Sequence, residues 1–343
     1  MSQFRFCRLT EQRVIIAENR LRKPDMFLSA LDHYFDDDVA NCPFEYGNEH
    51  LSGHEIFAIR DNGSEKDTVG WKTRVVPNLY HALSTDEEKK SRRIGFCESE
   101  NGVGAHEVII ETPNHTASMD QYTIEEFENY IKTIIARMDD LKNDIRLEYI
   151  QVFKNCGKYG GASMPHPHSQ IIATPFIPKN IKEQLKIQKS YFLKHGRSLM
   201  GDMVEEEIRV NERVIYENGT FLVFTPYASA FPFEVMVAPK HSIAMMTELT
   251  QYQINDLSLA MAFLFKRLYR ELGNFPFNLH FFNIPPMNNR NEPEFFYKMD
   301  EYGRFFVRIT PRIYQIGGFE LSTGMHINPI APELAAKRLK EER

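Results

Sequence analysis

The chain has 343 residues with 41 basic and 47 acidic side chains, and the resulting net charge of −6 argues against a dedicated nucleic-acid binder, which usually carries a basic surface. Hydrophobic residues make up 42% of the sequence, enough for the cores of two ordinary domains, and no apolar run approaches the roughly 20 residues that a membrane helix needs. The four cysteines are scattered and the N-terminus lacks a signal-peptide pattern, so we expect a soluble cytoplasmic protein.

The first predicted repeat is a strand, a helix and a second strand. The apolar pattern of residues 106–111 predicts the first strand. Thr123, with a glutamate three residues later, fits a capping box, and the apolar residues that follow recur at helical spacing. A second strand is predicted for residues 148–155, and its last residue, Asn155, lies 32 residues after Thr123. This repeat leads directly into the most distinctive segment of the chain.

That segment combines glycines with closely spaced histidines, and it reads Gly160-Gly161-Ala162-Ser163-Met164-Pro165-His166-Pro167-His168-Ser169-Gln170. Alternate side chains of a strand share a face, so His166, His168 and Gln170 should project together. A flexible glycine loop beside that face can bring backbone N–H groups close to phosphate oxygens. An imidazole facing a phosphate held in this way indicates nucleophilic attack on phosphorus through a covalent histidine intermediate.

A second stretch repeats the order of the first, after a polar helical connector. Residues 232–237 predict a strand, and Thr250 begins a helix with the same capping signal. A further predicted strand ends at Asn283, 33 residues after that cap, which matches the spacing of Asn155 to within one residue. No histidine lies between Asn283 and Pro311. We therefore expect the chemistry to belong to the first repeat.

These elements indicate an α+β fold of two repeated domains, each an antiparallel sheet with one long packed helix. We place the first, catalytic domain at residues 1–178, the helical connector at 179–215 and the second domain at 216–343. The second domain would support the first structurally or supply substrate contacts.

Five short motifs follow one another through the chain: Cys42-Pro43-Phe44, Val75-Val76-Pro77-Asn78, Glu111-Thr112-Pro113-Asn114-His115, His166-Pro167-His168-Ser169-Gln170, and Gly317-Gly318-Phe319-Glu320-Leu321-Ser322-Thr323-Gly324. In this order they resemble the galactose-1-phosphate uridylyltransferase family, the transferase branch of the histidine-triad superfamily, which is built from two histidine-triad-like domains. The resemblance covers nearly the whole chain, and the His-Pro-His-Ser-Gln element is its most specific part.

The resemblance implies a ping-pong transfer of UMP from UDP-glucose to galactose 1-phosphate. His168 would attack the α-phosphorus, expel glucose 1-phosphate and carry the uridylyl group, while Gln170 would hydrogen-bond the α-phosphate. The other implied substrate contacts are Asn155, Gly161 and Ser163 for the phosphates, Arg20 and Asn78 for the nucleotide, and Phe319, Glu320, Thr323 and Gly324 for the sugar. Because family members are dimers, the resemblance implies a homodimer with the sugar contacts contributed across the subunit interface.

The family's usual first metal site, a Cys-x-x-Cys pair with two histidines, is altered in this chain. Carboxylate oxygen is an acceptable zinc ligand, so one zinc site is still expected. Its ligands would be Cys42, Glu45, His115 and His166. Some family members have a second metal site with histidines from the second repeat. The corresponding residues here are Phe282, Arg304 and Phe306, so the second site is expected to be absent.

Other functions stay open at this stage. A plant relative with the same motifs acts as an ADP-glucose phosphorylase, in which phosphate replaces the sugar phosphate as acceptor. The altered metal site also fits a nucleotide-sugar-binding protein without turnover. Hydrolysis is disfavoured, because a hydrolase of this superfamily typically has a third histidine where Gln170 stands. The base, the sugar and the acceptor do not follow from residue types alone.

Overall fold

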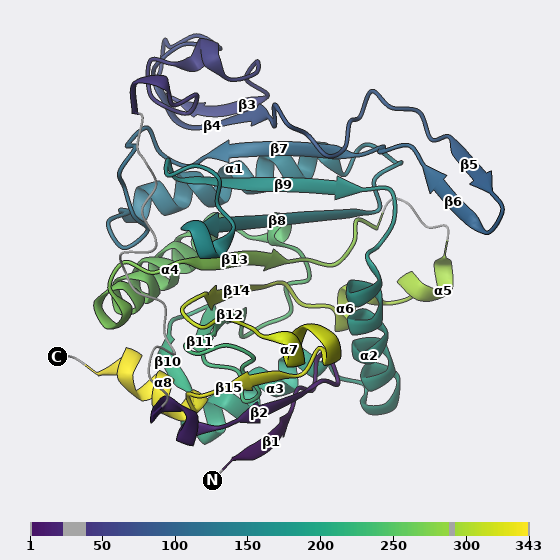
Figure 1. Ribbon diagram of the computed structural model, residues 1–343, viewed down its shortest axis with the longest axis vertical. Coiled ribbons are helices and arrows are strands. Elements are labelled where there is room, and N and C mark those ends of the chain that lie inside the picture. The colour runs from purple at the N-terminus through teal and green to yellow at the C-terminus, as the bar shows by residue number, and fades with distance from the viewer. Residues whose placement is uncertain (1, 23–38, 288–291, 342–343) are drawn as a thin grey trace.

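The computed structural model describes residues 2–22, 39–287 and 292–341, and one ten-stranded sheet runs through both halves of the chain (Figure 1). Its neighbouring strands pair antiparallel throughout. From one edge to the other the strands are β10 (Val214–Glu217), β11 (Phe221–Phe224), β12 (Val235–Pro239), β14 (Phe306–Pro311), β13 (Phe277–Phe282), β8 (Tyr149–Cys156), β9 (His168–Thr174), β7 (Ala105–Ile110), β4 (Trp71–Pro77) and β3 (Phe57–Arg60).

The strand order confirms the predicted repeat. In chain order the first half contributes β3, β4, β7, β8 and β9, and the second half contributes β10, β11, β12, β13 and β14. Each set has the same spatial order, and the two sets meet where β8 pairs with β13. The two halves therefore share a sheet instead of packing as separate ones. The predicted domain limits at residues 178 and 215 stay a prediction.

One long helix per repeat covers the same face of the sheet, α1 (Ile124–Leu141) and α4 (Gln251–Leu272) (Figure 1). Both predicted capping boxes are present, with the side chains of Thr123 and Thr250 each accepting a backbone N–H from the third helical residue. The two helices touch through stacked Phe127 and Phe265 rings, 6.3 Å apart. The fully buried side chains between helices and sheet form one continuous hydrophobic cluster, so the opposite face is left for the site.

Smaller elements surround this framework. A three-stranded sheet lies beside the second half and a two-stranded hairpin projects from the first (Figure 1). These strands are β1 (Gln3–Phe6), β2 (Arg13–Ile16) and β15 (His326–Asn328), with β5 (Ser91–Ile94) and β6 (Cys97–Glu100) in the hairpin. The remaining α-helices are α2 (Lys179–His195), α3 (Leu199–Val210), α5 (Pro293–Phe296), α6 (Met299–Tyr302), α7 (Gly318–Thr323) and α8 (Pro332–Lys340). Within the described residues, no helix combines the length and the apolar character that crossing a membrane requires.

The matched spacing of Asn155 and Asn283 does not give the two residues equivalent surroundings. Asn155 is opposite Asn278 in the β8–β13 ladder. Asn283 is fully buried on the helix side, where its side-chain oxygen accepts the N–H of Met246 at 2.8 Å and its amide contacts Met138. A shift of one residue reverses the face of a strand to which a side chain points, so a spacing of 33 residues instead of 32 removes the equivalence.

Candidate active site and metal site

A glycine loop between β8 and β9 delivers His168 to the open face of the sheet. The loop contains the short helix η5 (Lys158–Gly160), and Gly161 has φ of +84°, a conformation that favours glycine. A Cβ on Gly160 would lie 2.7 Å from the carbonyl oxygen of Phe277, so the loop rests directly on β13. Glycine is thus required both for the turn and for this close approach to the second half of the chain.

His168 has the tautomer and protonation state that nucleophilic attack requires. Its side chain is 5% exposed, and its Nδ1 lies 2.8 Å from the carbonyl oxygen of His166. Because a carbonyl only accepts, Nδ1 carries the proton and the lone pair is on Nε2. Burial and the nearby Lys154 ammonium lower the pKa of His168 below its usual range. A neutral imidazole with a free Nε2 is the nucleophilic form.

A cavity of about 400 Å³ lies on one side of His168. Its lining includes Phe44, Asn78, Ser163, His168 and Gln170. The Gln170 side-chain oxygen is 2.8 Å from Nε2 of His106, whose Nδ1 accepts the N–H of Ala82 at 3.1 Å. The ring proton is therefore on Nε2 of His106, which donates to Gln170 and also lies 3.1 Å from the amide nitrogen of Asn78. This leaves the Gln170 NH₂ group for a ligand.

A second cavity, of about 270 Å³, also reaches His168. Its lining includes Lys154, Asn155, Cys156, His115, His166 and His168. Gly161 lies beside it, since a Cβ there would be 3.8 Å from the amide nitrogen of Asn155. The structure thus gathers five of the predicted catalytic and substrate-contact residues around the imidazole of His168. They are Asn78, Asn155, Gly161, Ser163 and Gln170.

Three buried side chains next to His168 form a group that could hold a metal ion. Ligand atoms of Cys42, His115 and His166 all lie within 4.8 Å of one another. The fourth predicted ligand, Glu45, has a carboxylate oxygen 2.7 Å from Nδ1 of His115 and 3.7 Å from Nδ1 of His166. Three of the four predicted ligands therefore form one group, and the carboxylate of Glu45 lies against its two histidines.

The protonation of His166 suits a metal ligand. Its Nε2 donates to the Thr112 carbonyl oxygen at 2.9 Å, which leaves the lone pair on Nδ1, directed toward His115. Burial, the largest cause, lowers the pKa of His166 to about 4, so the ring is neutral at physiological pH. Cysteine, two histidines and a carboxylate form a donor set that zinc accepts, and the residues present fit such an ion.

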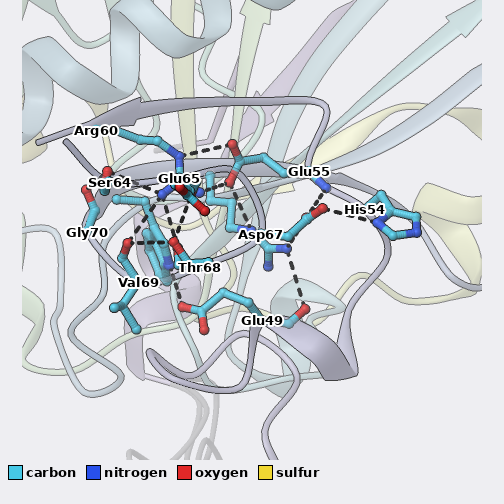
Figure 2. Close-up of polar contacts among 12 residues, drawn as sticks. Glu49, His54, Glu55, Arg60, Ser64, Glu65, Asp67, Thr68, Val69 and Gly70 are labelled. Carbon is cyan, nitrogen blue, oxygen red and sulfur yellow. Dashed lines mark hydrogen bonds and ion pairs between the residues drawn. The ribbon is translucent and has the colours of Figure 1, made fainter. Parts of the chain in front are cut away.

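A polar network joins residues 49–70, which follow Cys42 and Glu45 in the chain, to β4 (Figure 2). Arg74 of β4 is 1% exposed and contacts the Asp67 carboxylate at 3.2 Å and the Glu55 carboxylate at 3.3 Å. Glu55 also pairs with Arg60. A buried guanidinium is tolerated only when such partners surround it. The network therefore fixes the path of residues 52–67 against β4.

The remaining predicted substrate contacts do not line either cavity in the described part of the chain. Arg20 lies in η1 (Glu18–Arg22), and its Nε is buried without a hydrogen-bond partner. Phe319, Glu320 and Thr323 belong to α7, and Gly324 is its C-cap. Glu320 caps its own helix by accepting the N–H of Gly317 at 2.9 Å. Their placement across a subunit interface stays a prediction.

A buried ion pair under β9 was not found from the sequence. Lys154 lies 2.9 and 3.0 Å from the two Glu111 carboxylate oxygens and donates to the carbonyl of His168 at 3.2 Å. Ser169 and Tyr122 donate to the same carboxylate at 2.5 and 2.9 Å. The sequence does contain a signal for this pair, because Glu111 ends the apolar segment that predicted β7. A carboxylate at the end of a buried strand needs a charged or hydrogen-bonding partner.

Comparison with solved structures defines the class of the fold. An ADP-glucose phosphorylase from Arabidopsis thaliana, solved with bound ADP-glucose, is 27% identical, superposes with a TM-score of 0.82, and covers 100% of both chains. A uridylyltransferase structure with a TM-score of 0.73 and 21% identity, covering 99% of this chain and 97% of its own, shares the fold. Two α+β repeats on one sheet thus place this protein in the class of two-domain histidine-triad proteins.

Sequence comparison identifies the family. The model described as galactose-1-phosphate uridyl transferase, N-terminal domain, matches residues 58–178, and its C-terminal counterpart matches residues 183–342. The A. thaliana ADP-glucose phosphorylase is 29% identical over 335 residues, 97% of this chain and 91% of that protein. A galactose-1-phosphate uridylyltransferase from Thermotoga maritima is 27% identical over 274 residues, 77% of this chain and 82% of that protein. The chain belongs to the galactose-1-phosphate uridylyltransferase family of nucleotidyltransferases.

Proposed function

We propose that the protein transfers a nucleoside monophosphate from a nucleotide sugar to a phosphate-containing acceptor through a covalent adduct on His168. The observation that carries the proposal is the state of this residue, a buried neutral imidazole with Nε2 free. Gln170 and Asn155 flank it from the two cavities. Phosphoryl transfer needs mainly positioning and hydrogen-bond donors around the phosphate oxygens, which this arrangement supplies.

The reaction balances in two displacements. In the first, Nε2 of His168 forms a bond to the α-phosphorus as the bond from that phosphorus to the bridging oxygen breaks, and the sugar 1-phosphate leaves. In the second, an acceptor phosphate oxygen attacks the same phosphorus and the N–P bond breaks, which restores the imidazole. The carbonyl of His166 holds the Nδ1 proton throughout. The Gln170 NH₂ group would donate to an α-phosphate oxygen in both steps.

Two acceptors are compatible with this chemistry, and the relatives distinguish them only in part. Similarity to an ADP-glucose phosphorylase extends over 97% of the chain and over the whole fold, which supports inorganic phosphate as acceptor and ADP-glucose as donor. The matches to galactose-1-phosphate uridylyltransferases support transfer of UMP from UDP-glucose to galactose 1-phosphate. We place the phosphorylase reaction first because the phosphorylase is 29% identical and superposes with a TM-score of 0.82, whereas uridylyltransferases that match as much of the chain are 26–27% identical and the uridylyltransferase structure has a TM-score of 0.73.

Intact-protein mass after brief incubation with one nucleotide sugar and no acceptor tests both the route and the donor. An acid-labile AMP adduct from ADP-glucose would support the phosphorylase, and a UMP adduct from UDP-glucose would support the uridylyltransferase. The adduct should vanish in His168→Gln and persist in His195→Gln, a matched change at an exposed histidine. Measurable binding of nucleotide sugars without any adduct would favour the non-catalytic binding protein.

We also propose that zinc is held by Cys42, His115 and His166, with Glu45 as a further ligand. When bound, the ion would supply electrostatic and structural support at the base of the loop that leads to His168. Metal analysis of the purified protein by mass spectrometry tests the identity of the ion.

We propose a homodimer because the predicted sugar contacts of α7 line neither of the two cavities described above. If α7 of one subunit completes its partner's site, mixing inactive His168→Gln with an inactive Phe319→Asp variant should restore part of the activity. Light scattering should then report twice the 40.1 kDa chain mass. The cytoplasmic location stays a prediction that fractionation would check.

A further inference from the structure

A chain of hydrogen bonds connects the second repeat to the proposed phosphate site. Arg312, which follows β14, donates from Nη1 to the side-chain oxygen of Asn278 on β13 at 2.9 Å. The Asn278 amide nitrogen lies 2.8 Å from the side-chain oxygen of Asn155 and 2.6 Å from the carbonyl oxygen of Gly160. The chain thus crosses from the strand end of one repeat to the glycine loop of the other.

The donor and the acceptor of every hydrogen bond in this series follow from the two groups at its ends, Arg312 and the carbonyl of Gly160. Arginine has only donors, so the atom of Asn278 that faces Arg312 is the oxygen. The carbonyl of Gly160 only accepts, so the atom of Asn278 that faces it is the NH₂ group. Both hydrogens of that group are then used, one on Gly160 and one on Asn155. The Asn155 oxygen therefore faces β13, and its own NH₂ group is turned the other way, beside Gly161 and the cavity of His168.

The far end of the chain is itself held in place. The guanidinium of Arg312 lies over the ring of Phe231, 5.3 Å from its centroid. The backbone N–H of Arg312 donates to the carbonyl of Pro276 at 2.7 Å. A cation packed on an aromatic face and tied at its backbone loses little further freedom when it donates to a neighbour, so Arg312 presents a fixed donor to Asn278.

We propose that Asn278 and Arg312 are positioning residues that set the orientation of the Asn155 amide toward the reacting phosphate. The proposal rests on the proposed function, since it assigns the donor role to Asn155. Without these hydrogen bonds, the amide of Asn155 could turn and present its oxygen to a phosphate oxygen. A repulsion between two oxygen atoms would then replace the hydrogen bond from the NH₂ group. The second repeat, without catalytic histidines of its own, thereby takes part in the reaction of the first.

The test is the single-turnover rate of adduct formation on His168 at saturating donor. Asn278→Asp keeps the oxygen for Arg312 and removes both donors, so the rate should fall about 10- to 100-fold, as when one oriented donor to a developing oxyanion is lost. The donor dissociation constant should change less than about threefold, because the effect is greatest in the transition state. Asn278→Ala serves if the aspartate variant does not fold.

Asn255→Ala is the matched control, because Asn255 on α4 also bridges the repeats, through the Glu128 carboxylate at 3.0 Å, but lines neither cavity. It should leave the adduct rate within about twofold. If Asn278 had only a structural role, Asn278→Asp and Asn278→Ala would lower the thermal stability and the fraction of active protein. The rate of adduct formation per active site would then stay unchanged.

A double variant decides whether Asn278 acts through Asn155. In an Asn155→Ala background, Asn278→Asp should slow the reaction by less than about threefold more, because the residue that it orients is already gone. Fully multiplicative effects, or a rate unchanged by Asn278→Asp alone, would refute the positioning role while the wild-type adduct still supports nucleotidyl transfer. No adduct in the wild type with either donor would refute both.

Discussion

The buried pair of Glu111 and Lys154 supports a quantitative prediction, because it lies directly behind β9, the strand that begins with His168. Both side chains are almost completely buried, and the ammonium also bonds the carbonyl of His168. Lys154→Met leaves the Glu111 carboxylate with only the hydroxyls of Ser169 and Tyr122. Removing one member of a buried pair typically destabilises a protein by about 3–5 kcal/mol, since the other charge stays buried.

The double variant should recover most of that loss. Replacing both members with groups of similar volume, Glu111→Gln with Lys154→Met, removes both desolvated charges, and such replacements are often close to neutral. We expect the double variant to be within about 2 kcal/mol of the wild type and each single variant to be clearly less stable. The coupling free energy between Glu111 and Lys154 in this double-mutant cycle is then several kcal/mol. Independent sites deviate from additivity by much less.

Urea unfolding, followed by circular dichroism and by fluorescence, measures the free energies, provided that the two probes give coincident transitions. The control is the exposed pair of Lys72 and Glu125 at 2.7 Å, for which the same cycle should give no resolvable interaction free energy, because solvent screens both charges. If the single variants lose less than about 1 kcal/mol, or if the two losses simply add, the pair is not behaving as an isolated buried charge pair and the reasoning fails.

Three further predictions concern the site itself. Burial and Lys154 lower the pKa of His168, so the single-turnover rate of adduct formation should stay constant as the pH falls below 6.5 and should decline only at lower pH. Lys154→Met should move that decline to higher pH, because the Glu111 carboxylate then favours the imidazolium form of His168. Cys42→Ser should reduce bound zinc at least tenfold in metal analysis, whereas Cys97→Ser, at an exposed cysteine, should leave it unchanged. Arg74→Met should weaken zinc retention against a chelator without changing the ligands, because it loosens residues 52–67, which follow Cys42 and Glu45 in the chain. Retention equal to the wild type would show that the network is not needed.

The sequence predicted the repeat because its signals are local. Each capping box requires two side chains three residues apart, and both Thr123 and Thr250 form the predicted cap. The metal cluster also followed from motif positions, since Cys42, His115 and His166 converge. The assignment of these three residues as metal ligands came from the family resemblance. The number of residues between them does not by itself show that they lie close together.

The parts that could not be predicted depend on the register between strands. Asn278 was passed over in favour of Asn283, since spacing along the chain does not report which residue lies opposite Asn155. The pairing of Glu111 with Lys154 likewise joins strands that are separated by β9. The join between β8 and β13 was also missed, because the repeats were treated as two sheets and the pairing of edge strands depends on three-dimensional packing.

The join of β8 to β13 means that equivalent strands of the two repeats pair with each other about an approximate two-fold axis. Such an interface is isologous, the kind that closes a symmetric dimer of identical chains. One chain of this protein therefore has the architecture of a dimer whose subunits are covalently linked. Cutting it between the repeats would expose a long edge strand on each piece, and separated halves should re-pair or self-associate through that edge. The linkage also lets the two copies diverge, so that one keeps the histidines while the other is free to orient a neighbouring side chain, as proposed for Asn278 and Asn155.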